Sequence, residues 1–310
     1  MNQKSAIAIH GGAGTIAPHL LTPELEKAYL EGLRTALLAG DSLLKKGGSS
    51  TEAVLAAVIE FENNPLFNAG KGAVFNSLGK HEMDAAIMEG KHLNAGAVCG
   101  VKNIKNPVVL AHAVMTKSPH VMMAGEGAEK FAQSVGMSLT DEDYFYTEHR
   151  YQQWLEIRDT ENYQLDHTAK SENKMGTVGA VALDFEGNIA AATSTGGMTN
   201  KKFGRVGDSP IIGAGNYANN ETCAISCTGH GELFIRSVVA YDISCLMAYK
   251  GLTLKQACDL VVMDKLVKIG GEGGLVAIDA MGNIEMPFNS EGMYRASLDV
   301  DGEISVKIYR

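Results

Sequence analysis

A long polar segment divides this chain into two halves and ends at a glycine–threonine pair. Residues 140–174 are rich in Asp, Glu, Gln, Asn and His, and Gly176-Thr177 then opens the apolar, β-favouring run of residues 178–184. A stretch of this length without clear periodicity is usually functional or disordered. The segment therefore predicts a connection between two structured halves that could be cut at its end.

Cleavage of the Gly176–Thr177 bond would make Thr177 a new N-terminus, with its amine within reach of its own hydroxyl. Threonine hydroxyls are poor nucleophiles, and an N-terminal amine is one of the few groups that activate them. Threonine is also an ordinary strand residue. The pair taken alone leaves a catalytic and a purely structural interpretation open.

Size and charge limit the classes of partner. The chain has 310 residues, 45% of them hydrophobic, which suits one large globular domain or two small ones. A net charge of −9 would repel a phosphate backbone, and no segment approaches the roughly 18 apolar residues of a membrane-spanning helix. The first apolar run, residues 6–9, is too short for a signal-peptide core. We therefore expect neither nucleic acid nor membrane as a partner.

The five cysteines are odd in number and lack the spacing of a disulfide framework. Reduced thiols in a cytoplasmic protein are the expectation. Cys223, Cys227 and His230 also resemble a set of metal ligands. Strand alternation explains the two cysteines better, because residues four apart share one face, and we see no convincing fourth ligand nearby.

The first half of the chain mixes helices and short strands. Thr22-Pro23 predicts a helix start that Gly47-Gly48 ends, and Ser49 with Glu52 forms a capping box for the next helix, to about Glu62. Further on, we expect a helix over residues 124–135 and short strands over residues 72–75, 84–88, 95–98 and the run after Pro107.

The second half contains a short internal sequence repeat. Residues 181–189 resemble residues 276–284, and both predict β-hairpins that turn at Asp-x-x-Gly-Asn. Helices are expected over residues 231–248 and 253–268. Strand clusters and helix pairs in both halves predict sheets that pack together and are covered by helices.

Thr195 ends the strand that follows the first hairpin. Because the ends of antiparallel strands meet, Thr195 and Thr177 could lie near each other. A hydroxyl there could hydrogen-bond the nucleophile or its amine. On spacing alone, an ordinary turn closed by the threonine hydroxyl is favoured.

Arg205 and Asp208 place a cation and an anion three residues apart on a glycine-rich loop. Arginine binds a carboxylate with a planar fork, and aspartate accepts from an ammonium. The pair could therefore clamp the zwitterion of a free amino acid. The alternative is a surface ion pair, worth about 0 to 1 kcal/mol.

Thr228 and Gly229 lead from a strand into a glycine-rich helix entry. Backbone amides at such an entry suit an oxyanion, and plain turn chemistry is the alternative. The glycine loop at residues 11–14 lacks the ending of a phosphate-binding loop. His10, before that loop, could be a base, although a core or turn histidine fits its place after a buried strand better.

Six motifs in one order resemble the plant-type L-asparaginases, also called isoaspartyl or β-aspartyl peptidases, of the N-terminal-nucleophile hydrolases. The resemblance covers essentially the whole chain. The motifs are His10-Gly11-Gly12-Ala13-Gly14, Pro65-Leu66-Phe67-Asn68-Ala69-Gly70, Met175-Gly176-Thr177-Val178-Gly179-Ala180, Thr193-Ser194-Thr195-Gly196-Gly197, Gly204-Arg205-Val206-Gly207-Asp208-Ser209-Pro210 and Thr228-Gly229-His230-Gly231-Glu232.

This resemblance implies an α+β fold, a four-layer αββα sandwich that forms a single domain over residues 1–310. It also implies autocleavage between Gly176 and Thr177 into an α chain, residues 1–176, and a β chain, residues 177–310. The mature form would be a dimer of αβ units.

The resemblance also implies a role for each motif. Thr177 would be the nucleophile and its freed amine the base, and Thr195 would support it. Thr228 and Gly229 would form the oxyanion hole. Substrate contacts would come from four positions that match the family motifs: Arg205, Asp208, Gly231 and Asn68.

No cofactor is expected for catalysis, but the family has a structural sodium loop built mostly from backbone carbonyls. The matching positions here are Phe61, Glu62, Asn64, Phe67, Ala69 and Lys71. Carbonyl ligation tolerates side-chain change, so Lys71, where an apolar residue is familiar, does not exclude the ion.

The activity implied is release of aspartate from L-asparagine and from β-aspartyl dipeptides, both small-molecule substrates. Glycosylasparaginase is a close alternative, but its relatives place an Asp before the nucleophile, where this chain has Gly176. Protein-cleaving threonine hydrolases would need an open groove, which a zwitterion clamp argues against. A non-catalytic amino-acid-binding protein would remain a single chain.

Overall fold

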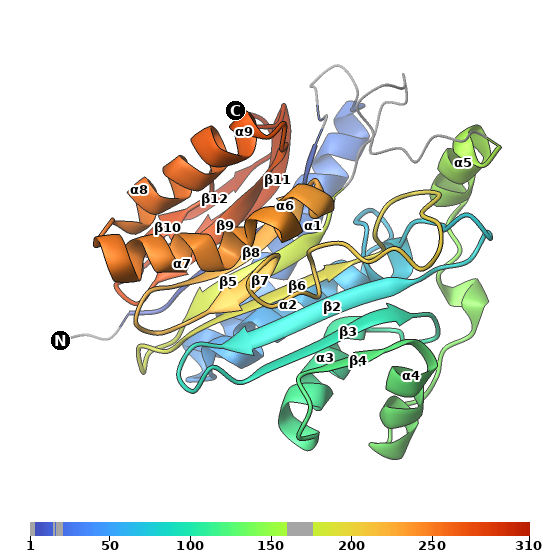
Figure 1. The fold of residues 1–310 in the computed structure, drawn as a ribbon, viewed down its shortest axis with the longest axis horizontal. Coiled ribbons are helices and arrows are strands. Elements are labelled where there is room, and N and C mark those ends of the chain that lie inside the picture. The colour runs from blue at the N-terminus through green and yellow to red at the C-terminus, as the bar shows by residue number, and fades with distance from the viewer. Residues whose placement is uncertain (1–3, 15, 17–20, 160–175) are drawn as a thin grey trace.

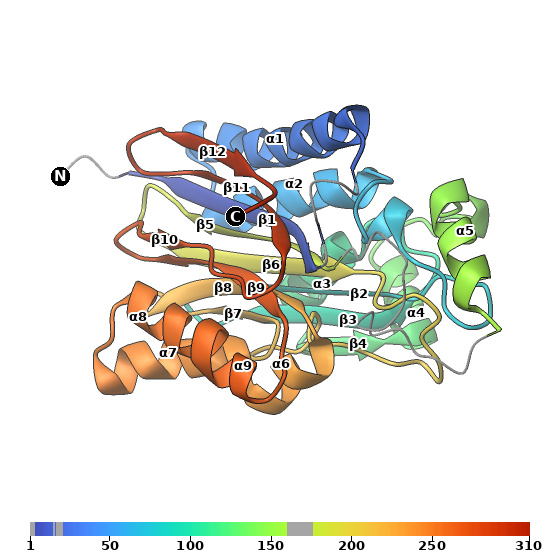
Figure 2. The same cartoon turned by 90° about the horizontal axis from the view of Figure 1, so that it is seen from above.

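Two β-sheets lie face to face between two layers of helices (Figures 1 and 2). The structure is a computed structural model that describes residues 4–14, 16, 21–159 and 176–310. The larger sheet has the order β12 (Ile304–Lys307), β11 (Gly292–Leu298), β1 (Ala6–Gly14), β5 (Val178–Leu183), β6 (Ile189–Thr195), β2 (Met83–Glu89), β3 (Ala95–Val101) and β4 (Met122–Ala124). The smaller sheet has the order β10 (Ile284–Glu285), β9 (Gly273–Asp279), β8 (Cys223–Gly229) and β7 (Asn216–Ala218).

Helices from each half of the chain cover one outer face. The first half supplies α1 (Pro23–Lys45), α2 (Ser50–Asn63), η2 (Gly70–Gly72), α3 (Pro107–Lys117), α4 (Gly125–Ser134), η3 (Glu142–Tyr144) and α5 (Glu148–Ile157). The second half supplies α6 (Gly231–Ser237), α7 (Val239–Lys250), α8 (Leu254–Asp259), η4 (Leu260–Lys265) and α9 (Leu266–Lys268). Helices α1, α2 and α3 pack on the larger sheet, and α7 and α8 pack on the smaller one (Figure 2). This confirms the predicted αββα sandwich. Among the described helices, none combines the length and apolar character needed to cross a bilayer.

The predicted helix starts are confirmed in atomic detail. The Thr22 side chain caps α1 by accepting from the backbone N–H of Leu25. Ser49 and Glu52 form the reciprocal capping box of α2. Each bond satisfies a backbone N–H that has no partner within the helix.

Two predicted strands are wrong. The run after Pro107 is helix α3, whose buried residues include Val108, Ala111 and Val114, at the spacing of one helix face. Its β-branched valines favoured a strand locally, but packing on the sheet selected the helix. Residues 72–75 form no strand either, because the N–H groups of Ala73 and Val74 bond within a local turn.

The polar segment and one long helix also differ from expectation. Residues 140–174 were expected to lack clear structure, yet η3 and α5 lie within them; residues 160–175 fall outside the described residues. The helix expected over residues 231–248 is divided into α6 and α7. Val238 separates them with a left-handed φ of 48°.

Strand alternation decides which side chains face the space between the sheets. In β5, Val178 and Ala180 belong to the core under the helices, whereas Val181 belongs to the core between the sheets. Successive strand residues point to opposite faces. Thr177, just before β5, therefore shares the face that looks toward the smaller sheet.

Candidate active site

Thr177 lies where β5 begins and β6 ends. The register pairs Val178 with Ser194, so the next position places Thr177 opposite Thr195. Both threonines are buried. The Thr195 hydroxyl accepts from the backbone N–H of Gly197 at 3.0 Å, so it closes a local turn as well. Thr195 thus lies near Thr177, as predicted, and also closes a turn, as in the alternative interpretation.

The hydrogen-bond partner of the Thr177 hydroxyl is a residue that the sequence had not singled out. The Oγ1 of Thr177 and the Oγ of Ser209 are 3.0 Å apart, and both residues are buried. Ser209 directly follows Asp208 in the chain. Its position next to the proposed clamp is the signal that could have identified it.

A glycine loop wraps the Gly176–Thr177 junction. Gly12 has a φ of +115°, beside the bulge in the pairing of β1 with β11. A Cβ on Gly12 would lie 2.8 Å from the backbone nitrogen of Gly176 and 3.1 Å from its carbonyl carbon. Only a residue without a side chain allows this approach. The loop at residues 11–14 therefore packs against the bond expected to be cut.

Thr228 lies on the other side of this junction, near the end of β8. A Cβ on Gly176 would collide with the Thr228 hydroxyl, and that hydroxyl accepts from the backbone N–H of Ala13 at 3.1 Å. A threonine hydroxyl has one hydrogen. Because it accepts from Ala13, Thr228 keeps that hydrogen for another acceptor. Gly229 follows with a φ of +149°, opposite Gly273.

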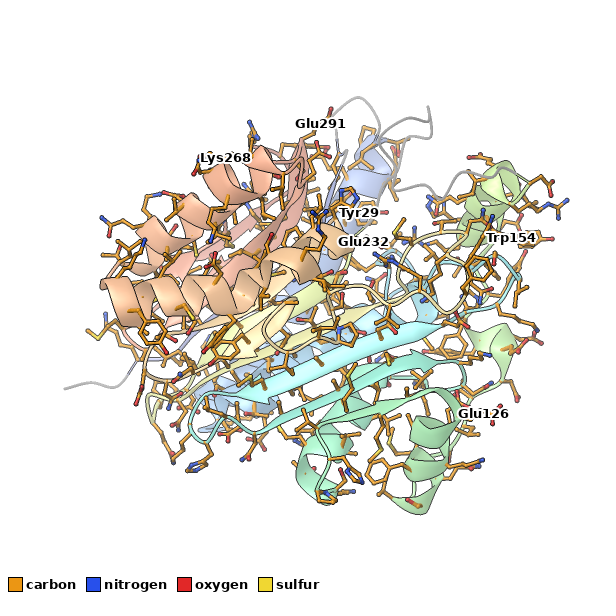
Figure 3. All side chains as sticks on the ribbon, in the orientation of Figure 1. Tyr29, Glu126, Trp154, Glu232, Lys268 and Glu291 are labelled. Carbon is orange, nitrogen blue, oxygen red and sulfur yellow. The ribbon has the colours of Figure 1, made fainter. Side chains whose placement is uncertain are left out.

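Arg205 forms an ion pair with Glu232, a partner that no spacing in the sequence had indicated. The guanidinium donates to both carboxylate oxygens, at 2.7 and 2.8 Å. Glu232 projects from the first turn of α6 (Figure 3). Two parallel charge-assisted bonds fix the plane of the guanidinium. Arg205 therefore forms an ion pair, as in the alternative interpretation, but with Glu232, and the pair uses Nε and Nη2 and not Nη1.

Asp208 is a buried carboxylate that lacks a complete set of partners. Its side chain is 3% exposed, and no described residue hydrogen-bonds its Oδ2. Burial raises the pKa of Asp208 to about 7, against the opposing effects of a hydrogen bond from its own backbone and the charge of Arg205. A buried carboxylate in this state gains most from a cation. The ammonium of an amino acid would supply one.

Gly231 keeps the space between these two groups open. A Cβ at this position would lie 2.7 Å from an Arg205 guanidinium nitrogen and 3.1 Å from Oδ1 of Asp208. Any larger residue would occupy the place where a carboxylate and an ammonium could bind together. The predicted grouping of Arg205, Asp208 and Gly231 is thus brought together in space.

Asn68 supports the turn that follows Thr195. Its side-chain amide donates to the carbonyl of Gly197 at 2.8 Å, and its side-chain oxygen accepts from the N–H of Val74. The structure therefore brings Asn68 to the same corner as Thr195.

The positions proposed for sodium run from the last turn of α2, through the connecting loop, into η2. These positions are Phe61, Glu62, Asn64, Phe67, Ala69 and Lys71. Cβ atoms on Gly70 and Gly72 would collide with the carbonyl oxygens of Glu62 and Phe67, so the chain can pass this close to those two oxygens only with glycine at both positions. Arg150, a buried residue of α5, donates to the carbonyls of Leu66 and Gly72. Backbone carbonyl oxygens are among the ligands that a hard cation prefers.

No three His, Cys, Asp or Glu side chains converge as a metal site in the described part of the chain. Cys223 and Cys227 lie buried in β8, where burial raises the pKa of both thiols. His230 follows at the start of α6.

Comparisons with known proteins agree with this geometry. The model of the family described as asparaginase matches residues 3–308. The chain belongs to the asparaginase family. The isoaspartyl peptidase of Salmonella typhimurium is 54% identical over 296 residues, which cover 94% of this chain and 95% of that relative. The putative isoaspartyl peptidase/L-asparaginase of Dictyostelium discoideum is 47% identical and covers 100% of both chains. The isoaspartyl peptidase/L-asparaginase of Xenopus laevis is 40% identical over 99% of this chain and 96% of its own length.

Membership of the asparaginase family confirms the predicted N-terminal-nucleophile hydrolase class. The chain is an enzyme of this hydrolase type, not an amino-acid-binding protein without activity. The match spans both halves of the chain. The site at the ends of β5, β6 and β8 is therefore the place to look for its chemistry.

Proposed function

We propose that this asparaginase-family enzyme cuts itself between Gly176 and Thr177 and then releases aspartate from β-aspartyl dipeptides and from L-asparagine. The proposal depends on one observation, that the residues proposed to bind the amino acid are connected to the proposed nucleophile. Arg205 and Asp208 flank the space kept open by Gly231, and Ser209, next to Asp208, hydrogen-bonds the Thr177 hydroxyl. The names of the relatives, isoaspartyl peptidase and isoaspartyl peptidase/L-asparaginase, support the same substrates.

Self-cleavage would use the groups packed around the junction. The Thr177 hydroxyl attacks the carbonyl carbon of Gly176, and the oxygen that becomes negative is stabilised by the Thr228 hydroxyl, which lies beside Gly176. The C–N bond then breaks, the Thr177 nitrogen takes the proton of the hydroxyl and leaves as the free amine, and the peptide has become an ester. Water hydrolyses this ester, which releases the carboxylate of Gly176 and restores the hydroxyl of Thr177.

Turnover would repeat the same chemistry on a small substrate. The Thr177 amine, with an ordinary pKa of about 7.7 to 8.0, removes the proton of the Thr177 hydroxyl. The hydroxyl attacks the side-chain carbonyl of the aspartyl head, with Thr228 and Gly229 as oxyanion donors. Ammonia or the amine of the second residue leaves, and water frees aspartate. Arg205 and Asp208 grip the α-carboxylate and α-ammonium that both substrates share.

The proposal includes the organisation of the mature enzyme. Residues 1–176 and 177–310 would remain together as α and β chains, and two such units would form a dimer. The five cysteines are all free, which supports a reducing, cytoplasmic location. Thr177 and its amine supply the nucleophile and the base, so we propose no catalytic cofactor.

A structural sodium ion is proposed for the turn between α2 and η2, on the carbonyl oxygens of the six residues named above. The ion would rigidify the turn that carries Asn68. We expect the melting temperature to rise by about 2 °C or more when choline chloride is replaced by sodium chloride at equal ionic strength, because an ion that binds only the folded state stabilises it. Equal melting temperatures in the two salts would remove the ion from the proposal.

The function is tested on the wild-type protein. Intact-mass analysis after incubation is expected to show two fragments divided after residue 176. Steady-state rates are then measured on β-Asp-Leu, on L-asparagine and on N-acetylglucosaminyl-asparagine. Release of aspartate from the first two, with the sugar conjugate much slower, supports the proposal. A chain that stays whole, or one fastest on the sugar conjugate, contradicts it.

A further inference from the structure

A network of buried polar side chains connects the two sheets directly behind Thr177. The Asn216 amide of β7 donates to the Thr193 hydroxyl of β6 at 3.0 Å. The Thr193 hydroxyl lies 2.7 Å from that of Ser226 in β8, and the Ser226 hydroxyl lies 2.8 Å from Nε2 of His10 in β1. All four residues are fully buried. The proposed chemistry uses none of them.

Strand register places this network one row behind the nucleophile. His10 pairs with Gly179 across β1 and β5, and Gly179 pairs with Thr193 across β5 and β6. Thr177 lies two residues before Gly179, on the same face. A Cβ on Gly179 would collide with the Ser226 hydroxyl and lie 2.6 Å from Nε2 of His10. The glycine therefore makes room for the network.

His10 is neutral and has one ring nitrogen unused. Burial lowers the pKa of His10 to about 3, against the raising effect of a hydrogen bond to the Thr177 backbone. A backbone group that raises a histidine pKa acts as an acceptor, as a carbonyl does. Nε2 is engaged by Ser226, whereas no described residue meets Nδ1 with full hydrogen-bond geometry. Nδ1 is thus the ring atom left for the Thr177 carbonyl.

The hydrogens of the network can run in one direction. The Thr193 hydroxyl has two acceptors within reach, Ser226 at 2.7 Å and the carbonyl of Gly215 at 3.3 Å, and its one hydrogen favours the shorter contact. Asn216 then donates to Thr193, Thr193 to Ser226, and Ser226 to Nε2 of His10. The single hydrogen of the neutral ring is then on Nδ1. In a neutral histidine, the hydrogen bond made by one ring nitrogen decides whether the other nitrogen carries the hydrogen.

We propose that His10, oriented by Ser226, Thr193 and Asn216, is a positioning residue that holds the backbone carbonyl of Thr177 in the cut enzyme. The inference rests on the proposed function. Cleavage turns Thr177 into a chain end, just before β5 begins, and chain ends fray unless they are tied down. A bond to the carbonyl restrains Thr177 while its amine and hydroxyl stay free to react.

This role differs from that of a general base. The proposed partner of His10 is the backbone carbonyl of Thr177, whereas the hydroxyl of Thr177 lies 3.0 Å from that of Ser209. A neutral ring locked between Ser226 and a carbonyl fixes a position. Misplacing a reacting group by about 1 Å can cost about 100-fold in rate.

The test uses three variants of the full chain, each measured after cutting. His10→Phe removes both ring nitrogens, His10→Asn keeps an N–H donor near Nδ1, and Ser226→Ala removes the hydroxyl that orients the ring. We expect His10→Phe to lower kcat on β-Asp-Leu by roughly 10- to 100-fold, with KM within about twofold, because Arg205 and Asp208 are untouched. His10→Asn should recover part of kcat, and Ser226→Ala should lower it by roughly 3- to 10-fold.

Two matched controls separate positioning from general loss of stability. His81 is a second buried histidine, whose Nδ1 lies 3.3 Å from the carbonyl of Val74, and Ser244 is a buried hydroxyl 2.7 Å from that of Thr222. His81→Phe and Ser244→Ala should lower the melting temperature about as much as the network variants, with kcat unchanged.

Several outcomes would overturn the proposal. These are a wild-type kcat in His10→Phe, a KM that rises as much as kcat falls, or no recovery in His10→Asn. We expect every variant to be cut, because Gly176 still anchors Thr177 before cleavage. A folded His10→Phe chain that stays whole would assign His10 to cleavage instead. Should that variant not fold, His10→Asn and Ser226→Ala decide alone. Failure of the proposed function would be visible separately, as an uncut or inactive wild-type protein.

Discussion

Thr177→Ala is expected to leave the protein as one uncut chain without measurable hydrolysis. The variant loses the hydroxyl that attacks Gly176 and, because no cut occurs, also the amine that would act as base. Loss of a nucleophile typically costs about 10⁴-fold or more in kcat. Intact mass and aspartate release measure the two effects on one sample.

Thr177→Ser is the matched variant for this experiment. It keeps a hydroxyl at the same position and should still be cut, with slower turnover because serine lacks the methyl group that restricts its rotamer. Ser209→Ala keeps the nucleophile and removes only its 3.0 Å partner. We expect this variant to be cut as well. Self-cleavage of Thr177→Ala would show that another residue is the nucleophile.

Asp208→Asn is expected to be cut normally and to lose most of its activity. The substitution keeps the shape of the side chain but removes the charge that would face the substrate ammonium. Truncating one partner of a buried charge pair costs about 2 to 5 kcal/mol, so kcat/KM should fall by roughly 30- to 5,000-fold. The loss should appear mostly in KM. Asp242→Asn, in a surface ion pair with Lys265, is the control and should change neither constant.

The ionisation of Asp208 decides in which direction kcat/KM is expected to change with pH. Burial raises the pKa of Asp208 to about 7 in the free enzyme, and only the carboxylate can grip an ammonium. kcat/KM should therefore rise as pH increases through about 7, and this limb should vanish in Asp208→Asn. kcat should lack the Asp208 limb, because a bound ammonium keeps the carboxylate ionised. An unchanged kcat/KM profile in Asp208→Asn would contradict the role of Asp208.

Local sequence rules predicted much of the fold. The caps at Thr22 and Ser49 and the two Asp-x-x-Gly-Asn hairpins depend on residues a few positions apart, so they are readable from the sequence. Helix α3 was missed because its valines favour a strand when considered alone. Packing against the sheet overrode that preference.

In the candidate site, too, the sequence predicted features formed by neighbouring residues and missed contacts between distant ones. Gly176-Thr177, Arg205-x-x-Asp208 and Thr228-Gly229 are short motifs whose chemistry was predicted from residue types. Their partners were not predicted. Ser209 lies 32 residues from Thr177, and Glu232 lies 27 residues from Arg205. His10 and Ser226 are separated by 216 residues, and no sequence pattern connects them.

The sequence by itself determined the bond expected to be cut, the clamp residues and the family. These features rest on side-chain chemistry and on short spacings that do not need a fold to be recognised. The tertiary structure alone decided which hydroxyl meets Thr177, which carboxylate holds Arg205 and which buried histidine lies behind the nucleophile. These contacts exist only because two sheets stack with a fixed register. Burial then makes an unpaired polar atom costly in free energy, so each buried polar group needs a partner.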